Sequence, residues 1–527
     1  FFFFFFFFFF CGYPFQNVRI IYKKRHLNYF FFLKLTIIYT LQRIKVALSP
    51  DYSPSIMKIK TINRSSDTYV PVKSTQESYI PRNLNKELHP LERSREYTKA
   101  LQATKLERVF AKPFIKQLGR GHADGVYQIA KNFNILNQIA TSDGDGIVKF
   151  WNLNQKSGDE EVLNFKGHYG MVSGLSFTQK TDSTNGMLLS CANDKTIKLW
   201  DVGTLTNELT QKSQNNEGAF QSGDKLSKVG LVKTFHDDYA FQSIDTHKAN
   251  FNQFVTGGQS LKLWDMTRSA PISDMSWGNN TVQHVRFNHS ETDIVLSSGT
   301  DNSVVLYDLR TNNPIQKMVQ QMRTNSMCFN PIEPMNFAVA CEDHNLYYYD
   351  MRNLTKALQV FKDHVAAVLD CDISPLGTEL VSSSYDKTIR IYDLNHGHSK
   401  EVYHTKRMQH VFQCKYTMDS KYLLSGSDDG NVRLWRARAW ERSDVKSTKY
   451  KNKLEYDEKL KEKFKYMPEI RKIKRHRHLP GVVKKAQEIK NIEIASLKRR
   501  EANENRYRKE KKYASEREKH IVRKVFD

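Results

Sequence analysis

The chain has 527 residues and a formal net charge of +24, so its length allows several domains. Its six cysteines are scattered without a CxxC pair, which favours core packing in a reducing compartment over a disulfide framework or a zinc site. Residues 1–56 carry 7 Lys/Arg against 1 Asp/Glu, 57–114 carry 12 against 6, 115–435 carry 31 against 35, and 436–527 carry 31 against 15. A slightly acidic body with a strongly basic extension indicates a polyanionic partner, with nucleic acid as the leading candidate.

Residues 1–56 begin with ten phenylalanines and show no clear period, and the first methionine is Met57. The longest apolar run, Tyr29–Leu41, is interrupted by Lys34 and is shorter than the roughly 20 residues that a membrane-spanning helix needs. A signal peptide is an alternative, but the segment lacks a charged start and a clean small-residue cleavage site. We favour upstream sequence translated ahead of a start at Met57, and we expect residues 1–56 to be disordered.

Residues 57–114 are predicted to form an N-terminal arm that contains a helix. Pro90 suits the first turn of a helix, and Pro113 stops the helix after Lys112. Two interpretations of this helix are open: it packs on the side of the following domain, or it reaches a neighbour in an assembly. The apolar side chains at mixed helical spacing are Tyr97, Leu101, Leu106, Val109 and Phe110.

A repeat organises residues 115–435. Its clearest copy is LLSCANDKTIKLWD at Leu188–Asp201, two apolar, β-branched runs joined by Asn193–Lys195, which predicts a β-hairpin with a tight turn. Successive copies are 49, 64, 43, 42, 43 and 43 residues apart. An Asp stands six residues before the aromatic in six copies, and Gly258 takes that place in the third. The aromatics are Trp151, Trp200, Trp264, Tyr307, Tyr349, Tyr392 and Trp435.

A repeat of roughly 40–45 residues with a Trp-Asp signature is typical of a β-propeller blade, because one four-stranded sheet cannot bury both of its faces alone. We therefore predict an all-β fold, a seven-bladed WD-repeat β-propeller over 115–435. Its polar insertion at 204–228, expected to be disordered, explains the 64-residue gap. Recurrence once per blade favours a structural network over a metal site. The expected blade residues are His122, Asp145, Trp151, His168, Asp194, Trp200, Asp301, Asp343, His364, Asp386, Asp429 and Trp435.

No catalytic motif is present in these repeats. The sequence lacks a GxxxxGK[ST] phosphate loop, a GxSxG nucleophile turn and an HExxH zinc helix. We therefore expect a non-enzymatic binding scaffold without a cofactor, a catalytic residue or a bound metal, and with no membrane and no small-molecule substrate as partners.

The basic extension, 436–527, is predicted to be largely helical. Arg436–Lys465 mixes aromatics with dense charge, and Val482 to about Lys524 has the pattern of a charged helix with a sparse apolar face. Between them lies a cluster without acids, which is either a solvated face, a nuclear-import signal or an RNA contact. RNA contacts there would be mostly to phosphate and therefore salt-dependent. The candidate RNA-contact residues are Arg471, Lys472, Lys474, Arg475 and Arg477.

Together, these segments resemble one family. The stretch RNLNKELHPLERSREYTKALQATKLERVFAKPF (82–114), the seven repeats, and the run from RARAWERSDVK to RHRHLP (436–480) are similar to the Sof family of nucleolar WD-repeat proteins, from about Met57 to Asp527. The resemblance implies a nuclear, nucleolar component of the small-subunit processome, associated with the U3 small nucleolar ribonucleoprotein and needed for 18S rRNA maturation. The implied partners are pre-ribosomal RNA, U3 small nucleolar RNA and processome proteins.

The resemblance also implies an alternative function. Animal members of this family are called cullin-four-associated factors, substrate receptors of a cullin-RING ubiquitin ligase that dock an adaptor through [WY]DxR after a blade's third strand. Tyr307–Arg310 and Tyr349–Arg352 match this motif in consecutive blades, and Arg268 comes one place late in the preceding blade. Arg310 and Arg352 are the candidate adaptor-docking residues, although each arginine could instead pair with an Asp of a neighbouring blade.

Overall fold

The computed structural model describes residue 87 and residues 91–154, 161–178, 186–205, 230–278, 281–441, 448–509 and 522–526. Contacts divide the chain into two units. One comprises Phe1–Pro81 and Val445–Asn452, of which residues 448–452 are described. The other, Arg82–Asp444 with Lys453–Asp527, holds the features discussed below. The predicted disordered segments, 1–56 and 204–228, lie outside the described residues except for residues 204 and 205.

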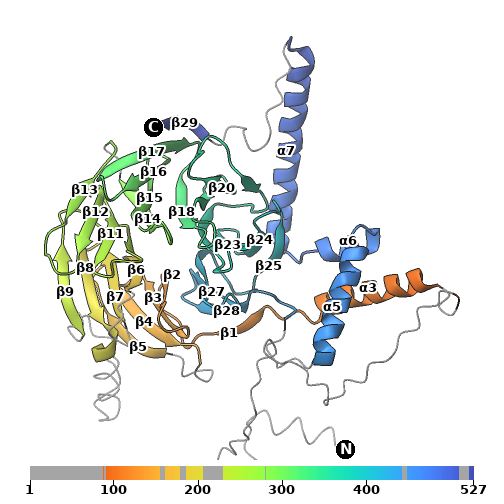
Figure 1. Ribbon diagram of the computed structural model, residues 1–527, viewed down its shortest axis with the longest axis horizontal. Helices are drawn as coiled ribbons and strands as arrows, with labels where there is room; N and C mark the ends of the chain where they lie inside the picture. The colour runs from red at the N-terminus through yellow and green to blue at the C-terminus, as the bar shows by residue number, and fades with distance from the viewer. Residues whose placement is uncertain are drawn as a thin grey trace, which may run out of the picture. The chain divides into compact units, whose positions relative to one another are not determined.

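Seven antiparallel sheets form a ring, which confirms the predicted propeller (Figure 1). The strands of blades 1 to 3 are β2 (Val126–Lys131), β3 (Gln138–Asp143), β4 (Ile147–Asn152) and β5 (Glu161–Lys166); β6 (Val172–Thr178), β7 (Met187–Ala192), β8 (Thr196–Asp201) and β9 (Leu231–His236); β10 (Ser243–Thr246), β11 (Gln253–Gly257), β12 (Leu261–Asp265) and β13 (Ser273–Met275).

Blades 4 to 6 repeat the same meander. Their strands are β14 (Val282–Phe287), β15 (Ile294–Gly299), β16 (Ser303–Asp308) and β17 (Asn313–Gln320); β18 (Thr324–Phe329), β19 (Asn336–Cys341), β20 (Leu346–Asp350) and β21 (Gln359–Phe361); β22 (Val368–Ile373), β23 (Glu379–Ser384), β24 (Ile389–Asp393) and β25 (Ser399–Tyr403).

Blade 7 is built from both ends of the repeat region. It contains β26 (Val411–Tyr416), β27 (Tyr422–Ser427) and β28 (Val432–Arg436), and its outer strand is β1 (Phe114–Gln117), which precedes blade 1 in the chain. β1 pairs antiparallel with β28, and the Phe114 ring meets the Trp435 ring edge-on at 5.4 Å between centroids. The ring is therefore closed by a strand from before the first repeat.

The hairpin between the second and third strands has the predicted tight turn. The residue after the repeat Asp adopts positive φ in six blades, a conformation in which a side chain is tolerated at some cost and glycine at none. The Asp side chain stabilises this turn: Asp194 accepts the Thr196 amide at 3.1 Å, and Asp386 accepts the Thr388 amide at 3.0 Å. The positive-φ residues are Gly146, Lys195, Asn302, His344, Lys387 and Gly430.

The apolar core lies between neighbouring blades. The Phe165 ring of blade 1 lies 4.8 Å from the Trp200 ring of blade 2, and Trp151 packs with Leu424 and Val432 of blade 7. Because each aromatic of the repeat is fully buried, its burial contributes roughly 2–3 kcal/mol and requires the next blade. The five cysteines in the described ranges are buried and free, in line with the predicted core packing.

The segments that flank the propeller are largely helical. They are α3 (Glu92–Val109), α5 (Thr448–Lys463), α6 (Pro468–Arg475) and α7 (Gly481–Tyr507). The prediction of one helix to about Lys524 is wrong at both described ends of the segment that follows Tyr507: the helix ends at Tyr507, and β29 (Val522–Phe526) adds a fifth strand to the outer edge of blade 4, paired with β17. Within the described ranges, no helix is both long and apolar enough to cross a membrane.

Candidate interaction surfaces

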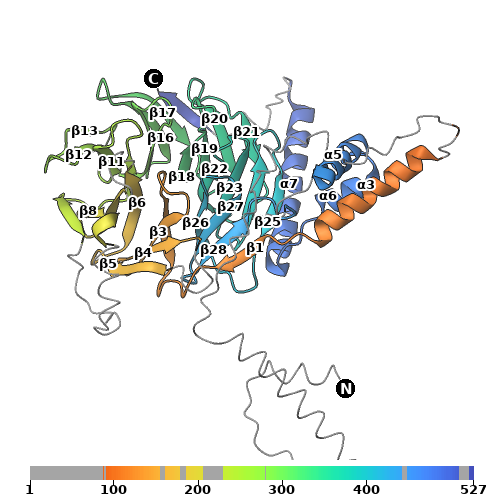
Figure 2. The ribbon, with the colours of Figure 1, turned by 60° about the horizontal axis from the view of Figure 1, so that its bottom comes forward.

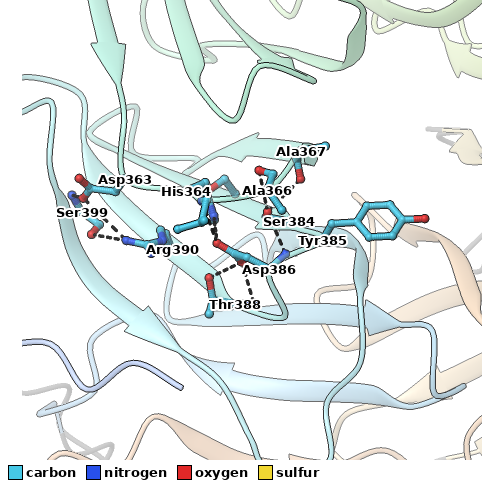
Figure 3. A network of polar contacts seen from close by, with 12 residues as sticks. Asp363, His364, Ala366, Ala367, Ser384, Tyr385, Asp386, Thr388, Arg390 and Ser399 are labelled. Carbon is cyan, nitrogen blue, oxygen red and sulfur yellow. Dashed lines mark hydrogen bonds and ion pairs between the residues drawn. The ribbon is translucent and has the colours of Figure 1, made fainter. Parts of the chain in front are cut away.

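The repeated His and Asp form buried networks in blades 1, 2 and 6. Since a carboxylate only accepts, the histidine Nδ1 donates to it, and Nε2 accepts from a Ser or Thr hydroxyl. Figure 3 shows the blade 6 network, with Tyr385 pointing away from it. The networks are His122 with Asp143 (3.0 Å) and Thr141 (2.6 Å), His168 with Asp194 (3.0 Å) and Ser190 (2.7 Å), and His364 with Asp386 (2.9 Å) and Ser382 (2.6 Å).

The prediction of Asp145 as the network residue of blade 1 is wrong, because the carboxylate that contacts His122 is Asp143. Asp143 is fully buried at the end of β3, opposite Val126, whereas Asp145 is exposed in the turn. Asp143 also accepts the Ile147 amide at 2.9 Å. The same His can therefore be reached from the last residue of the strand as well as from the turn.

The polar side chains of these networks find their hydrogen-bond partners within the same blade. Trp151 donates its ring N–H to Thr141 (2.7 Å), and Trp200 donates to Ser190 (2.9 Å). Burial lowers the pKa of His168 and His364, so both imidazoles are neutral at pH 7. Burial acts to raise the pKa of the partner carboxylates, but their histidine contacts hold it below the ordinary value. Polar groups bonded this way fix the core rather than bind a ligand.

The other three repeat aspartates have different partners. Asp301 pairs with Lys317 at 2.8 Å, Asp343 accepts from the Tyr347 hydroxyl, and Asp429 pairs with Arg433. Among the described residues, no group of three His, Cys, Asp or Glu side chains is arranged to hold a metal ion. The repeat residues are therefore structural, and functional surfaces must be sought outside these networks.

Arg310 and Arg352 occupy equivalent exposed positions after the third strands of blades 4 and 5. Their side chains are 73% and 71% exposed. Each donates to the Asp two residues earlier in its own blade, Asp308 at 3.4 Å and Asp350 at 2.9 Å. Arg310 also approaches Asp293 of its own blade at 4.0 Å. The pairing partner is thus the same blade's Asp rather than a neighbouring blade's, and both guanidinium groups stay at the surface.

The N-terminal arm and the basic extension meet in one helical module, defined here as α3, α5 and α6. Ala100, Leu460 and Ile470 form its buried centre, and the Tyr97 hydroxyl donates to Glu469 at 2.9 Å. Lys461 pairs with Glu107 at 2.9 Å. Figures 1 and 2 both show these helices side by side. The helix α3 therefore packs on the extension, a contact that sequence patterns gave no means to find.

This module is fastened to the outer strand of blade 6. Nη1 of Arg108 on α3 donates to both carboxylate oxygens of Glu401 on β25, at 2.8 and 2.9 Å, and Arg477 donates to the Ser399 carbonyl at 3.3 Å. From α7, Lys490 donates to the His364 carbonyl at 2.6 Å. Charge-assisted hydrogen bonds of this kind are stronger than neutral ones and favour a defined geometry.

The five candidate RNA-contact residues do not share one environment. Arg471, Lys472, Lys474 and Arg475 are exposed on α6, although burial lowers the pKa of Lys474. Arg477 is half-buried and donates to the carbonyls of Lys474, His476 and Ser399. Arg477 thus holds the module in place, and four of the five residues remain as an outward-facing cationic cluster.

Comparisons with known proteins match this architecture along the chain. A model described as "Sof1-like domain" matches residues 437–521, "WD domain, G-beta repeat" matches 114–152 and 159–201, and "NUP159/214 beta propeller" matches 265–438.

Relatives match over nearly their full length. Protein SOF1 of Saccharomyces cerevisiae is 60% identical over 473 residues, 88% of this chain and 94% of SOF1. Protein sof1 of Schizosaccharomyces pombe is 46% identical, and DDB1- and CUL4-associated factor 13 of Xenopus laevis is 42% identical, each over 88% of this chain and 99% of the relative. Since the matches include the propeller and the extension that follows it, the chain belongs to the Sof1 family of WD-repeat proteins.

Proposed function

We propose that this chain is a non-enzymatic scaffold of small-subunit ribosome biogenesis that acts in the nucleolus with the U3 small nucleolar ribonucleoprotein in 18S rRNA maturation. Family membership supports this function, and the separation of charge supports the mode of action. The observation that carries the RNA contact is the outward-facing cluster on α6, Arg471, Lys472, Lys474 and Arg475, beside a propeller whose own charges nearly cancel. Phosphate backbones of pre-ribosomal RNA match such a cluster.

Substitution tests the RNA contact better than truncation does. Deleting 436–527 would remove α5, α6 and β29 and so disturb the module and blade 4. Replacing Arg471, Lys472 and Arg475 by Ser removes three exposed charges. The matched control replaces Arg120, Lys406 and Arg407, which are exposed on propeller loops, by Ser.

The variant on α6 should bind RNA more weakly and with a shallower salt dependence. Each lost phosphate contact reduces the slope of log K against log salt by about 0.7–0.9, so three contacts reduce it by roughly 2–3. Filter binding of pre-ribosomal RNA across a salt series measures the slope, and gradient sedimentation measures entry into large pre-ribosomal particles. If both variants lose RNA affinity equally, or if neither variant loses any, the assignment of the RNA contact to α6 is contradicted.

A second candidate function is adaptor docking in a cullin-RING ubiquitin ligase. The observation that favours it is the pair Arg310 and Arg352, held in the same way at the ends of neighbouring blades and more than two-thirds exposed. The names of the animal relatives specify association with DDB1 and CUL4. Two exposed guanidinium groups at equivalent blade positions fit a shared docking surface on such an adaptor.

Replacing Arg310 and Arg352 by Ala should reduce co-purification with DDB1 by more than about tenfold, the cost of losing a hot-spot pair. The matched control is Arg268→Ala, on the same face in blade 3, where the spacing is one residue longer. If the wild-type chain does not co-purify with DDB1, or the double variant binds as well as the control, this function is excluded.

A further inference from the structure

The seven innermost strands surround a cavity of about 360 Å³ at their C-terminal ends. Its lining combines charged side chains with apolar ones, among them Leu175, Phe177 and Phe329. The first and third strands of each antiparallel blade run in the same direction, so this end of the channel lies on the face that carries Arg310 and Arg352. The blade networks described above are not part of it.

Two carboxylates that line the channel, Asp245 and Asp372, and a third beside it, Asp370, already have partners. Each accepts a backbone N–H from the next blade and pairs with one lysine, which fastens neighbouring blades and neutralises the acid. The three sets are Asp245 with the Phe287 amide (2.9 Å) and Lys248 (3.1 Å), Asp370 with the Cys414 amide (3.1 Å) and Lys415 (2.9 Å), and Asp372 with the Tyr416 amide (2.8 Å) and Lys131 (3.2 Å).

Arg286 is the cation of the channel lining that pairs with none of these three carboxylates. It lines the channel from β14, and no hydrogen bond or ion pair to its guanidinium is formed within the described part of the chain. Its charge still acts through space: burial would raise the pKa of Asp245, but Lys248 and then Arg286 keep it low. Arg286 is only partly buried, so its guanidinium is open to the channel, and an anionic ligand could form a charge-assisted contact there without displacing a protein partner.

Two histidines lie near Arg286 in the sequence of blade 4, and His289 is the one that lines the channel. His284 lies two residues before Arg286, on the same face of β14, and its buried Nδ1 has no hydrogen-bond partner in the described structure. His289 follows the strand and is exposed at its end. Desolvation by the channel wall, and then the charge of Lys248, lower the pKa of His289, so its neutral imidazole can donate one N–H to an anion at pH 7.

The charge balance selects the kind of anion. The lining has four cations, Lys131, Lys248, Arg286 and Lys415, against two carboxylates; with Asp370, which pairs with Lys415 from outside the lining, the net charge is +1. One carboxylate would be neutralised, whereas a polyphosphate would leave several negative charges beside three aspartates. The partly apolar lining suits the side chains that flank an acidic residue in a polypeptide.

We propose that this channel binds an extended segment of a partner protein by inserting one Asp or Glu side chain, with Arg286 as the anchor of its carboxylate. Arginine suits this task because its planar group donates two parallel hydrogen bonds to a carboxylate. The proposal concerns a peptide site on the propeller and is independent of the RNA contact proposed for α6.

The test uses the full chain and an array of 12-residue peptides, each synthesised in matched Glu and Gln versions. The wild type should prefer the Glu versions of the bound sequences by at least about tenfold, and Arg286→Met should abolish that preference. Arg286→Lys, which keeps the charge but loses the two parallel N–H donors, should retain part of the preference for the Glu versions. Arg268→Met removes the same charge from the same face outside the channel and should leave the preference unchanged.

Thermal unfolding checks that each variant is folded, and Arg286→Lys keeps the test informative if Arg286→Met is not. Equal binding of Glu and Gln versions by the wild type overturns the proposal, as does a preference that survives in Arg286→Met. Inositol hexakisphosphate is the probe for a polyphosphate ligand. If it binds stoichiometrically to the wild type and Arg286→Met abolishes that binding, the channel is a polyphosphate site and the proposal is overturned as well.

Discussion

Asp143 and Asp145 stand two residues apart in blade 1, yet their environments are opposite. Asp143 is buried and bonded to His122 and to the Ile147 amide, so Asp143→Asn should lower the free energy of unfolding by about 1–3 kcal/mol. Asp145 is exposed in the turn, and Asp145→Asn should change it by less than about 0.5 kcal/mol. Urea denaturation followed by tryptophan fluorescence measures both, and equal losses would show that Asp143 does not hold the blade together.

At the scale of single residues, the repeat spacing correctly locates side chains whose position the turn geometry fixes. It fails in blade 1, where the histidine's carboxylate partner comes from the strand instead of the turn. The buried aromatics, Asp194 and Asp386 are where the pattern places them because one turn geometry fixes them. Asp143 takes the strand position that Ala192 has in blade 2, since each lies opposite the first residue of its inner strand. A six-residue spacing points to the turn position, and it cannot show that in blade 1 the acid two residues earlier contacts His122.

At the scale of elements, the C-terminal strand β29 can be tested as a clasp on blade 4. Val522 and Val525 pack on the core shared by blades 4 and 5, so replacing both by Asp should release β29 and speed amide exchange at Met318–Gln320 on β17. The matched control replaces the exposed residues Arg523 and Lys524 of the same strand by Ser. Hydrogen exchange measured by mass spectrometry reads the difference, and unchanged protection of β17 in the Asp variant would contradict a stable β29.

The strand β29 could not be foreseen from its own sequence. VRKVF alternates apolar and charged residues over five positions, too short to stand out in a stretch of dense charge. Its partner β17 lies about 200 residues upstream, and pairing at such a separation leaves no local signal. The helix α7 ends at Tyr507 although the charged pattern continues, because charge alone does not define where a helix ends.

At the scale of the whole molecule, the repeat predicts seven blades and the flanks determine how they are held. The number of sheets follows from seven copies of one pattern, and the confirmed ring needed no information beyond it. What the pattern could not contain is the closing strand β1 and the contact of α3 with α5 and α6. Both depend on segments that are distant in the chain and irregular in composition, and they tie the N-terminal arm to the extension.

Two truncated chains test whether β1 is needed to close the ring of seven blades. A chain that begins at residue 112 keeps β1 and loses α3, whereas one that begins at residue 121 also loses β1 and the buried Leu118. The second chain leaves β28 as an unpaired edge and opens the core around Trp151, so we expect aggregation or a melting temperature lower by more than about 10 °C. The first chain should stay monomeric, with the circular dichroism of an intact propeller. Size-exclusion chromatography and thermal melts compare the two, and equal behaviour would mean that six complete blades and three strands of the seventh close the ring without β1.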